Sequence, residues 1–531
     1  MHKIVLLLLC VLACLPLSVF GQFEVQRGGC TPSPEGEEAL ARGTFRALPA
    51  VLGSWDSERT YRQMVVLVSF ADTDFKEENS PEFYNSLFNE KGFNKRNGPG
   101  CVADYFREQS GGLFNLQFDV FGPFKVSRNA RLSDNLDNGK DAFSEAMKML
   151  IAQNPELDFS PYDWNGNGMV NQVVIVYAGF PGNMVGYEGY VWPNTSYISS
   201  LPTNSGQTIS NYSASGELWP NNASCGLGTI CHEFSHSLGL PDIYPTVDDA
   251  GYSVMDEWDL MDGGNYTNFG WCPPNYTALE KMLLGWHAPI ELTEPTTITD
   301  MASVSEGGES YIVRHTDNEF FLIENRQWQG WDYGIPGRGL VVTHVDYDKT
   351  VWNNNNVNNS RSHRRCELVH ADNMDYDAWA KLIGGKSPYI EKSWLHNRHL
   401  SSSAYPWQTD STDFVNSELT DESTPATTTF AMNAAGACFL SKPITNITMT
   451  ADGRVSFDFM GGSSVMPPSP GDANGDGVVN VSDVTAIITR ILGKTSEPFF
   501  PDAADVNGDG IFNVTDVTLT INIILGNQHE Q

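Results

Sequence analysis

The chain has 531 residues, which is too long for one hydrophobic core, so we expect two to four domains. Its composition, with 40% hydrophobic and 11% aromatic residues, is that of a globular protein rather than a disordered one. The formal net charge of −33 argues against a nucleic-acid-binding protein, because affinity for phosphate comes from clustered Lys and Arg. Part of the acidity is concentrated in Asp-rich loops that suit divalent cations.

The first 21 residues have the pattern of a signal peptide. Lys3 gives a weakly basic start, Ile4 to Phe20 is almost wholly apolar, and Gly21 ends a small-residue cleavage site. The apolar run is short for a membrane span, which needs about 20 residues. Cys10 and Cys14 lack a lipoprotein signal, because apolar residues continue past both. We therefore expect a secreted or extracytoplasmic protein that begins near residue 22.

Residues 22–58 are rich in Gly, Pro and Glu and predict a pro-segment or a loose extension. The seven cysteines that remain after cleavage show no C-x-x-C spacing, so a cysteine zinc site is not indicated. Export permits disulfides, but an odd number leaves at least one thiol without an internal partner.

Predicted strands and helices are mixed in residues 59–290, where we expect an α+β domain. Continuous or alternating apolar runs predict strands over 64–70, 113–120 and 173–177, and residues 102–109 predict a short helix. Residues 291–460 predict a β-rich, sandwich-like domain, with strands over 311–314, 320–324, 340–345, 367–369 and 455–459 and an Asn-rich loop over 353–360. Residues 461–470 have the composition of a linker.

The string from Cys231 to Asp242 contains the main candidate site. On a helix, His232 and His236 lie on one face and can direct both imidazoles at one metal ion, and Glu233 lies beside them as a base. Zinc bound there would lower the pKa of a water molecule from 15.7 towards about 7. Gly239 and Pro241 end the helix and turn the chain back, so that Asp242 can be the third zinc ligand. Asp256 and Glu257 are alternative third ligands.

This string resembles the extended HExxHxxGxxH motif of the metzincins, with Asp242 in place of the third His, and this variant resembles the immune inhibitor A family of bacterial metallopeptidases. The resemblance covers roughly residues 60–460 and includes the segments 102–110, 177–179, 258–264, 284–286 and 321–326. It implies a zincin fold for residues 59–290 and Met261 as the Met-turn methionine. Met255 is the competing candidate, and either could be an ordinary core residue.

Residues 471–531 contain a duplicated calcium loop. Over 22 positions the copies that begin at Asp472 and Asp505 share 14 identities, and each offers oxygens at positions 1, 3, 5, 7, 9 and 12 of an EF-hand-like loop. A helix follows each loop. The predicted calcium ligands are Asp472, Asn474, Asp476, Val478, Asn480 and Asp483 in the first copy, and Asp505, Asn507, Asp509, Ile511, Asn513 and Asp516 in the second.

The Asp at position 12 and the absence of an incoming helix make this small α-helical module resemble a dockerin. The resemblance implies two Ca²⁺ ions and a cohesin-like partner that would contact Val481, Ser482, Val514 and Thr515. A calcium-stabilised tail without a partner fits the sequence equally well. A third loop with Asp163, Asn165 and Asn167 either holds a further Ca²⁺ or forms an Asn/Gly turn.

The sequence therefore predicts a secreted zinc endopeptidase that hydrolyses protein substrates, with one Zn²⁺ and Glu233 as general base. The alternative is a non-catalytic adhesion or scaffold protein that acts through its tail. Glu233 argues against this alternative, because a purely structural metal site needs no base. Cys30 is a candidate latency ligand, whose thiolate would occupy the zinc in a zymogen, but we favour a Cys30 that is oxidised or has no role.

Overall fold

The computed structural model describes residues 55–131, 138–184, 189–247, 252, 254–382, 400–408, 415–462, 470–474, 479–494 and 499–525. The chain divides into two compact units, residues 1–460 and 461–531. The predicted signal peptide, most of the predicted pro-segment and most of the linker lie outside the described residues.

The first unit begins with a five-stranded sheet in the order β2-β1-β3-β5-β4. Strands β2, β1, β3 and β5 run parallel, and β4 is antiparallel to β5 and forms one edge of the sheet. The strands are β1 (Thr60–Ser69), β2 (Asn115–Lys125), β3 (Val173–Tyr177), β4 (Asn194–Pro202) and β5 (Thr208–Gly216).

Both faces of this sheet are covered, which explains the continuous apolar run in β1. Because side chains alternate along a strand, Met64 and Val66 pack with Phe143 of α6, while Val65 and Leu67 belong to the core that contains Phe234 of α7. The helices of this region are α4 (Pro81–Asn89), α5 (Val102–Gln109), α6 (Lys140–Gln153), α7 (Gly228–Ser237) and α8 (Ala278–Leu283), with short 3₁₀ turns η3 (Ser160–Tyr162), η4 (Asp256–Trp258) and η5 (Gly264–Gly270).

A second five-stranded sheet has the order β11-β10-β9-β8-β6, and a three-stranded sheet has the order β14-β15-β7. Further short elements are a two-stranded ribbon, two helices and two 3₁₀ turns. The strands are β6 (Ile290–Glu291), β7 (Thr296–Met301), β8 (Tyr311–Arg314), β9 (Glu319–Arg326), β10 (Gly339–Asp346), β11 (Cys366–Leu368), β12 (Trp407–Gln408), β13 (Val415–Asn416), β14 (Ile444–Met449) and β15 (Val455–Phe459), and the other elements are α9 (Lys349–Asn353), α10 (Tyr376–Leu382), η6 (Val304–Glu306) and η7 (Gly330–Gly334).

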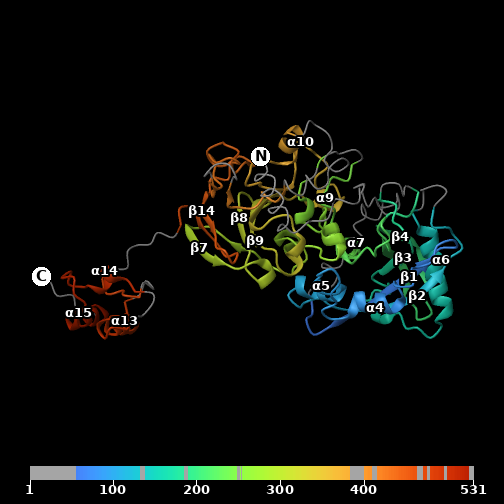
Figure 1. Ribbon diagram of the computed structural model, residues 1–531, viewed down its shortest axis with the longest axis horizontal. Coiled ribbons are helices and arrows are strands. Elements are labelled where there is room, and N and C mark those ends of the chain that lie inside the picture. Colours follow the sequence, from blue (N-terminus) through green and yellow to red (C-terminus); the bar gives the residue numbers. More distant parts are fainter. Residues whose placement is uncertain are drawn as a thin grey trace, which may run out of the picture. The chain divides into compact units, whose positions relative to one another are not determined.

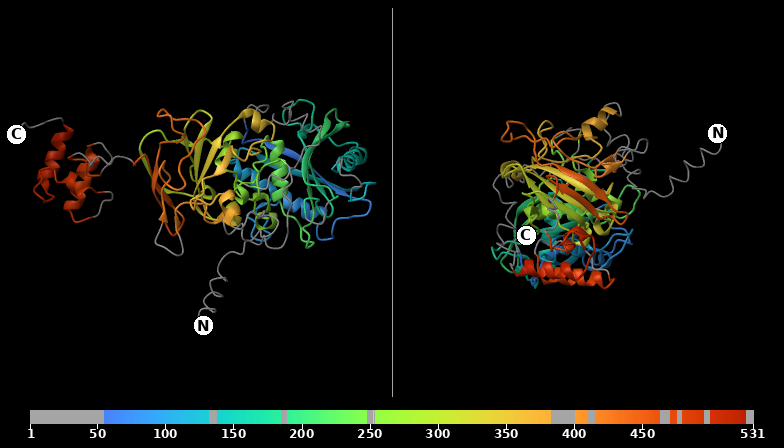
Figure 2. Two further views of the ribbon diagram at one scale, coloured as in Figure 1. Left: turned by 90° about the horizontal axis from the view of Figure 1, so that it is seen from above. Right: turned by 90° about the vertical axis from the view of Figure 1, so that its left-hand side faces the viewer.

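Strand β9 joins these layers, because its alternating side chains enter two cores. Phe321 and Ile323 pack with Phe457 of the three-stranded sheet, while Phe320 and Leu322 belong to the same core as Phe234 of α7. In Figures 1 and 2, α7 lies between the β1–β5 sheet and the β8–β10 sheet. Residues 60–460 thus contain a mixed α/β region and β-rich layers that share a hydrophobic core.

The second unit contains two similar helices, α13 (Val481–Ile491) and α15 (Val514–Ile524), and a short helix, α14 (Pro501–Ala504). Asn480 and Asn513 cap the two long helices in the same way, each in a capping box with the Asp three residues later. A small core around Ala473, Ala486 and Ile487 holds the unit together.

Candidate metal centre and calcium loops

Helix α7 carries three of the predicted site residues and ends where the sequence suggests. His232, Glu233 and His236 are buried, with exposed fractions of 2%, 1% and 7%. Gly239 follows the helix with φ of +102°, a left-handed conformation that favours glycine, and the chain then reverses towards Asp242. The turn thus returns Asp242 to the helix face that carries both histidines.

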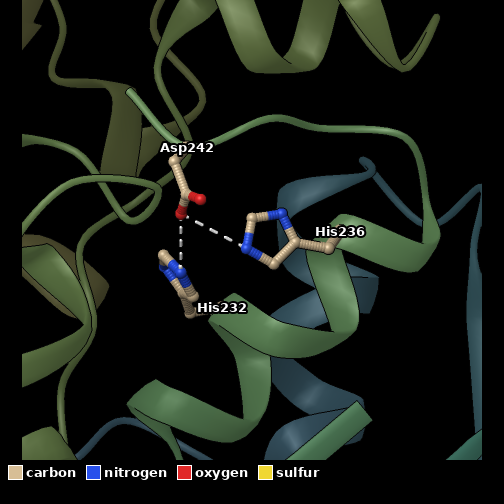
Figure 3. A group of neighbouring side chains, drawn as sticks. All are labelled: His232, His236 and Asp242. Carbon is tan, nitrogen blue, oxygen red and sulfur yellow. Dashed lines mark ion pairs between the residues drawn. The ribbon is translucent and has the colours of Figure 1, made fainter. Parts of the chain in front are cut away.

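The three side chains converge on one point (Figure 3). Asp242 Oδ1 lies 3.2 Å from His232 Nε2 and 3.3 Å from His236 Nε2, and the three ligand atoms lie within 4.8 Å of one another. In tetrahedral zinc sites with bonds of about 2.0–2.2 Å, neighbouring ligand atoms are about 3.3–3.6 Å apart. The observed distances therefore suit a small divalent cation between these atoms.

Backbone carbonyls hold both imidazoles in the orientation that a metal requires. His232 Nδ1 lies 2.8 Å from Leu260 O, and His236 Nδ1 lies 2.8 Å from Leu240 O. A carbonyl accepts only, so Nδ1 carries the proton in each ring and Nε2 is left to face Asp242. Asp242 Oδ1 and His236 Nε2 are buried without a hydrogen-bond partner among the described residues, as expected for ligand atoms.

The charges in this cluster depend on one another. Burial by itself would lower the pKa of His236, but the Asp242 carboxylate raises that pKa to about 9. Burial would raise the pKa of Asp242, but His236 and His232 hold it well below its usual range. Both shifts have the same cause, the close approach of the Asp242 carboxylate and the imidazoles, and a cation bound between them would take the place of this positive charge.

Glu233 has a neighbour that the sequence did not indicate. Thr195, on the edge strand β4, places its Oγ1 2.7 Å from the backbone oxygen of Glu233 and 3.0 Å from its Oε2. Thr195 is itself buried. The hydroxyl can thus orient the carboxylate beside the two histidines. No local sequence signal identifies Thr195, because the contact depends on the position of β4 next to α7.

The segment 255–262 lies behind the cluster. Met261 is fully buried, its neighbour Leu260 accepts from His232, and its own backbone oxygen accepts from the N–H of Ile243 at 2.8 Å. Met255 is also buried, and its backbone N–H donates to Asp262. Asp256 and Glu257 are described and buried, but neither belongs to the group of converging ligand atoms.

The second tail loop is held by a set of carboxylate and amide contacts. The N–H of Asp509 donates to Asp505 Oδ1 and to Asn507 Oδ1, both at 3.1 Å, and the N–H groups of Gly510 and Ile511 donate to Asp505 Oδ2 at 2.7 Å and Asp509 Oδ1 at 2.8 Å. Oxygens at positions 1, 3 and 5 are thereby gathered on the inside of one turn.

The position-12 carboxylates close both tail loops. Asp516 Oδ2 accepts from the N–H of Asn513 at 3.0 Å, and Asp483 Oδ2 accepts from the N–H of Asn480 at 2.8 Å. Asp483 and Asp516 are both fully buried. Asp472 and Asn474 of the first loop are described, whereas the predicted ligands Asp476 and Val478 lie outside the described residues.

The loop that begins at Asp163 repeats the contacts of the second tail loop. The N–H of Asn167 donates to Asp163 Oδ1 at 3.0 Å and to Asn165 Oδ1 at 3.3 Å, and those of Gly168 and Met169 donate to Asp163 Oδ2 at 2.8 Å and Asn167 Oδ1 at 2.9 Å. Gly166 and Gly168 have positive φ, as do Gly508 and Gly510. The first half of this loop thus has the same local structure as a tail loop.

The second halves of these loops differ. In the tail loop the N–H of Val506 donates to Asp516 at position 12, whereas in the loop at Asp163 the N–H of Trp164 donates to Asn171 at position 9. Position 12 there is Val174, a buried residue of β3. The loop at Asp163 consequently has fewer carboxylates than either tail loop.

The remaining predicted residues are outside these sites. Cys30, Cys10 and Cys14 lie outside the described residues. The described cysteines are free thiols, and only Cys438 among them is exposed. Val481 and Val514 occupy equivalent positions of α13 and α15, and each is 70% exposed. No described helix is long and apolar enough to cross a membrane.

Comparisons with known proteins find one matching domain family in each of the two compact units. Residues 56–281 match the catalytic domain of immune inhibitor A peptidase M6, and residues 470–525 match the dockerin type I domain. A pre-pro-metalloprotease PrtV of Vibrio cholerae is 21% identical in an alignment of 255 positions that covers 39% of this chain and 28% of the relative. An immune inhibitor A of Bacillus thuringiensis is 24% identical in an alignment of 276 positions that covers 42% of this chain and 39% of the relative. The chain thus matches less than half the length of either relative.

Proposed function

We propose that this chain, which carries a peptidase M6 catalytic domain and a dockerin type I domain, is a secreted zinc endopeptidase. The observation that carries the proposal is the convergence of His232, His236 and Asp242 beside Glu233. Two imidazoles and one carboxylate are a donor set that zinc accepts, and three protein ligands leave one position for a reactant.

Each residue has a separate role in this proposal. His232, His236 and Asp242 would hold the metal, and the carbonyls of Leu260 and Leu240 keep the imidazoles in the ligating tautomer. Bound zinc supplies a Lewis acid that polarises a peptide carbonyl and acidifies water at neutral pH. Glu233 takes the proton of the attacking water and passes it to the nitrogen of the leaving amine. The apolar side chain of Met261 would form the floor beneath the metal ligands.

The test compares the wild type with Glu233→Ala, using a generic protein such as casein as substrate. We expect zinc-dependent cleavage by the wild type and loss of cleavage in the variant, which should still bind zinc, because Glu233 is not a ligand. Turnover near wild type in the variant would refute the mechanism. If the wild type binds zinc but cleaves no protein, the alternative of a non-catalytic adhesion or scaffold protein is favoured.

The calcium sites belong to the same proposal. We assign one Ca²⁺ to each tail loop, supported by the gathered oxygens of Asp505, Asn507 and Asp509 and by the duplication of the sequence. The loop with Asp163, Asn165 and Asn167 would hold a third Ca²⁺, supported by the contacts that it shares with the second tail loop. Calcium bound per chain should fall from three to two in Asp163→Ala, and an unchanged number would favour an Asn/Gly turn.

The termini carry the remaining proposals. Residues 1–21 would direct export and residues 22–58 would form a pro-segment, and the name pre-pro-metalloprotease of one relative is in keeping with both. The tail would bind a cohesin-like partner through the exposed surface that includes Val481 and Val514. The test compares the proteolytic activity of the wild-type proform with that of the Cys30→Ser proform. If both are equally latent or equally active, a thiol switch is excluded, and we expect this outcome.

A further inference from the structure

An asparagine-rich loop from the β-rich part of the chain lies against the segment that carries Asp242. The loop follows α9 and lies outside the region that matches the peptidase domain. Asn358 Nδ2 donates to the backbone oxygen of Ile243 at 2.8 Å, and the N–H of Thr246 donates to Asn359 Oδ1 at 2.7 Å. Residues 242–246 are therefore fixed by side chains more than 100 positions further along the chain.

One residue of this loop contacts Asp242 twice. The N–H of Asp242 donates to Asn355 Oδ1 at 2.6 Å, and Asn355 Nδ2 donates to Asp242 Oδ2 at 2.8 Å. The two hydrogen bonds fix both the backbone and the carboxylate of Asp242. Because Oδ2 is occupied by the amide, the other oxygen, Oδ1, is the one that faces both histidines.

We propose that Asn355 is a positioning residue of the metal centre, which orients Asp242 so that Oδ1 alone ligates the ion. The proposal rests on the metal site described above. An uncharged amide suits this role, since it fixes the carboxylate without cancelling the negative charge that the metal needs. Asn355 also has φ of +55°, a conformation that Asn tolerates better than most residues.

The expected loss of zinc affinity can be taken from measurements on other metal sites. Hydrogen-bond partners of ligating side chains typically contribute 10- to 100-fold to metal affinity. Asn355 is half-buried and holds the fully buried Asp242 at two points, its backbone N–H and its carboxylate. We therefore expect loss of the Asn355 side chain to weaken zinc binding by about 10- to 100-fold.

The experiment measures zinc affinity of the full chain by competition with a chromogenic chelator. Asn355→Gly removes the side chain and relieves the positive φ. Asn355→Asp keeps the acceptor for the N–H of Asp242 but replaces the amide donor with a second carboxylate. Asn359→Ala is the matched control, because it removes a contact of the same loop with Thr246 and leaves Asp242 untouched. Thermal unfolding in excess chelator reports whether each variant is folded without zinc.

We expect Asn355→Gly and Asn355→Asp each to weaken zinc binding by about 10-fold or more, with Asn359→Ala within about threefold of the wild type. Wild-type affinity in Asn355→Asp would overturn the proposal, because the amide donor would then be unnecessary. Equal losses in Asn359→Ala would also overturn it, since the loop would act only through packing. If Asn355→Gly does not fold, the zinc affinity of Asn355→Asp alone tests the proposal. Absence of zinc binding by the wild type would instead refute the proposed function itself.

Discussion

Replacing Thr195 by Val tests whether the edge strand β4 orients the proposed base. The two side chains have nearly the same shape, so the change removes one hydroxyl and creates little cavity. In the structure that hydroxyl faces two acceptors, the backbone oxygen of Glu233 at 2.7 Å and its Oε2 at 3.0 Å. The variant therefore leaves Glu233 in place but removes the Thr195 hydroxyl from beside its carboxylate.

The size of the effect follows from sharing one proton between two acceptors. A hydrogen bond to a charged group contributes about 1.5–3 kcal/mol, and we assign about half of this, about 0.8–1.5 kcal/mol, to the carboxylate. If the orientation of Glu233 matters only in the transition state, kcat should fall about 4- to 12-fold, because about 1.4 kcal/mol corresponds to a factor of ten. KM and zinc content should not change.

The assay measures kcat and KM on a fluorescent casein substrate, together with zinc per chain. Ser213→Ala is a suitable control, because Ser213 pairs directly with Thr195 across β4 and β5, is buried, and has a hydroxyl without a hydrogen-bond partner among the described residues. We expect the control to retain wild-type kcat. A Thr195→Val enzyme within twofold of the wild type, or one whose activity falls only in proportion to lost zinc, would refute the reasoning.

Three further predictions concern the metal, the tail and pH. Asp242→Ala should lower zinc per chain, measured by elemental analysis, and an unchanged zinc content would move the third ligand to Asp256 or Glu257. Removal of calcium should speed amide hydrogen exchange in α13 and α15 but not in α7, and unchanged exchange in the tail would contradict the loop assignment. Burial raises the pKa of Asp372 from 3.8 to about 7, so this residue should destabilise the fold progressively as pH rises from about 4 to about 7. Asp372→Asn should therefore melt higher than the wild type at pH 8 but not at pH 4, and parallel melting profiles would argue against this.

The sequence predicted best those elements whose local pattern matches their environment. The strands 173–177, 311–314 and 455–459 and the helix 102–109 have the predicted bounds. Their apolar residues face cores on one or both sides, so periodicity alone identifies them. The strand predicted over 113–120 instead spans Asn115–Lys125, because Gly111 and Gly112 turn the chain and Ser110 Oγ accepts from the N–H of Phe114.

Elements with polar sequences were not predicted. Strands β4 and β5 contain many Ser, Thr and Asn residues, which favour loops when judged locally, yet both pair along the sheet. Thr195 belongs to β4, so its contact with Glu233 could not be anticipated. The Asn-rich loop was predicted as a loop, but its contacts with Asp242 depend on how distant segments pack, which no local pattern contains.

The pairing of Asp242 with Asn355 also bears on the order in which the protein is assembled. The two residues are 113 positions apart. At synthesis rates of about 5–20 residues per second, His232 and His236 emerge roughly 6–25 s before the loop that fixes Asp242. A nascent chain thus contains the histidines and the glutamate early but lacks the partner of the carboxylate. If Asn355 orients Asp242 as proposed, completion of the centre is deferred until the β-rich layers form.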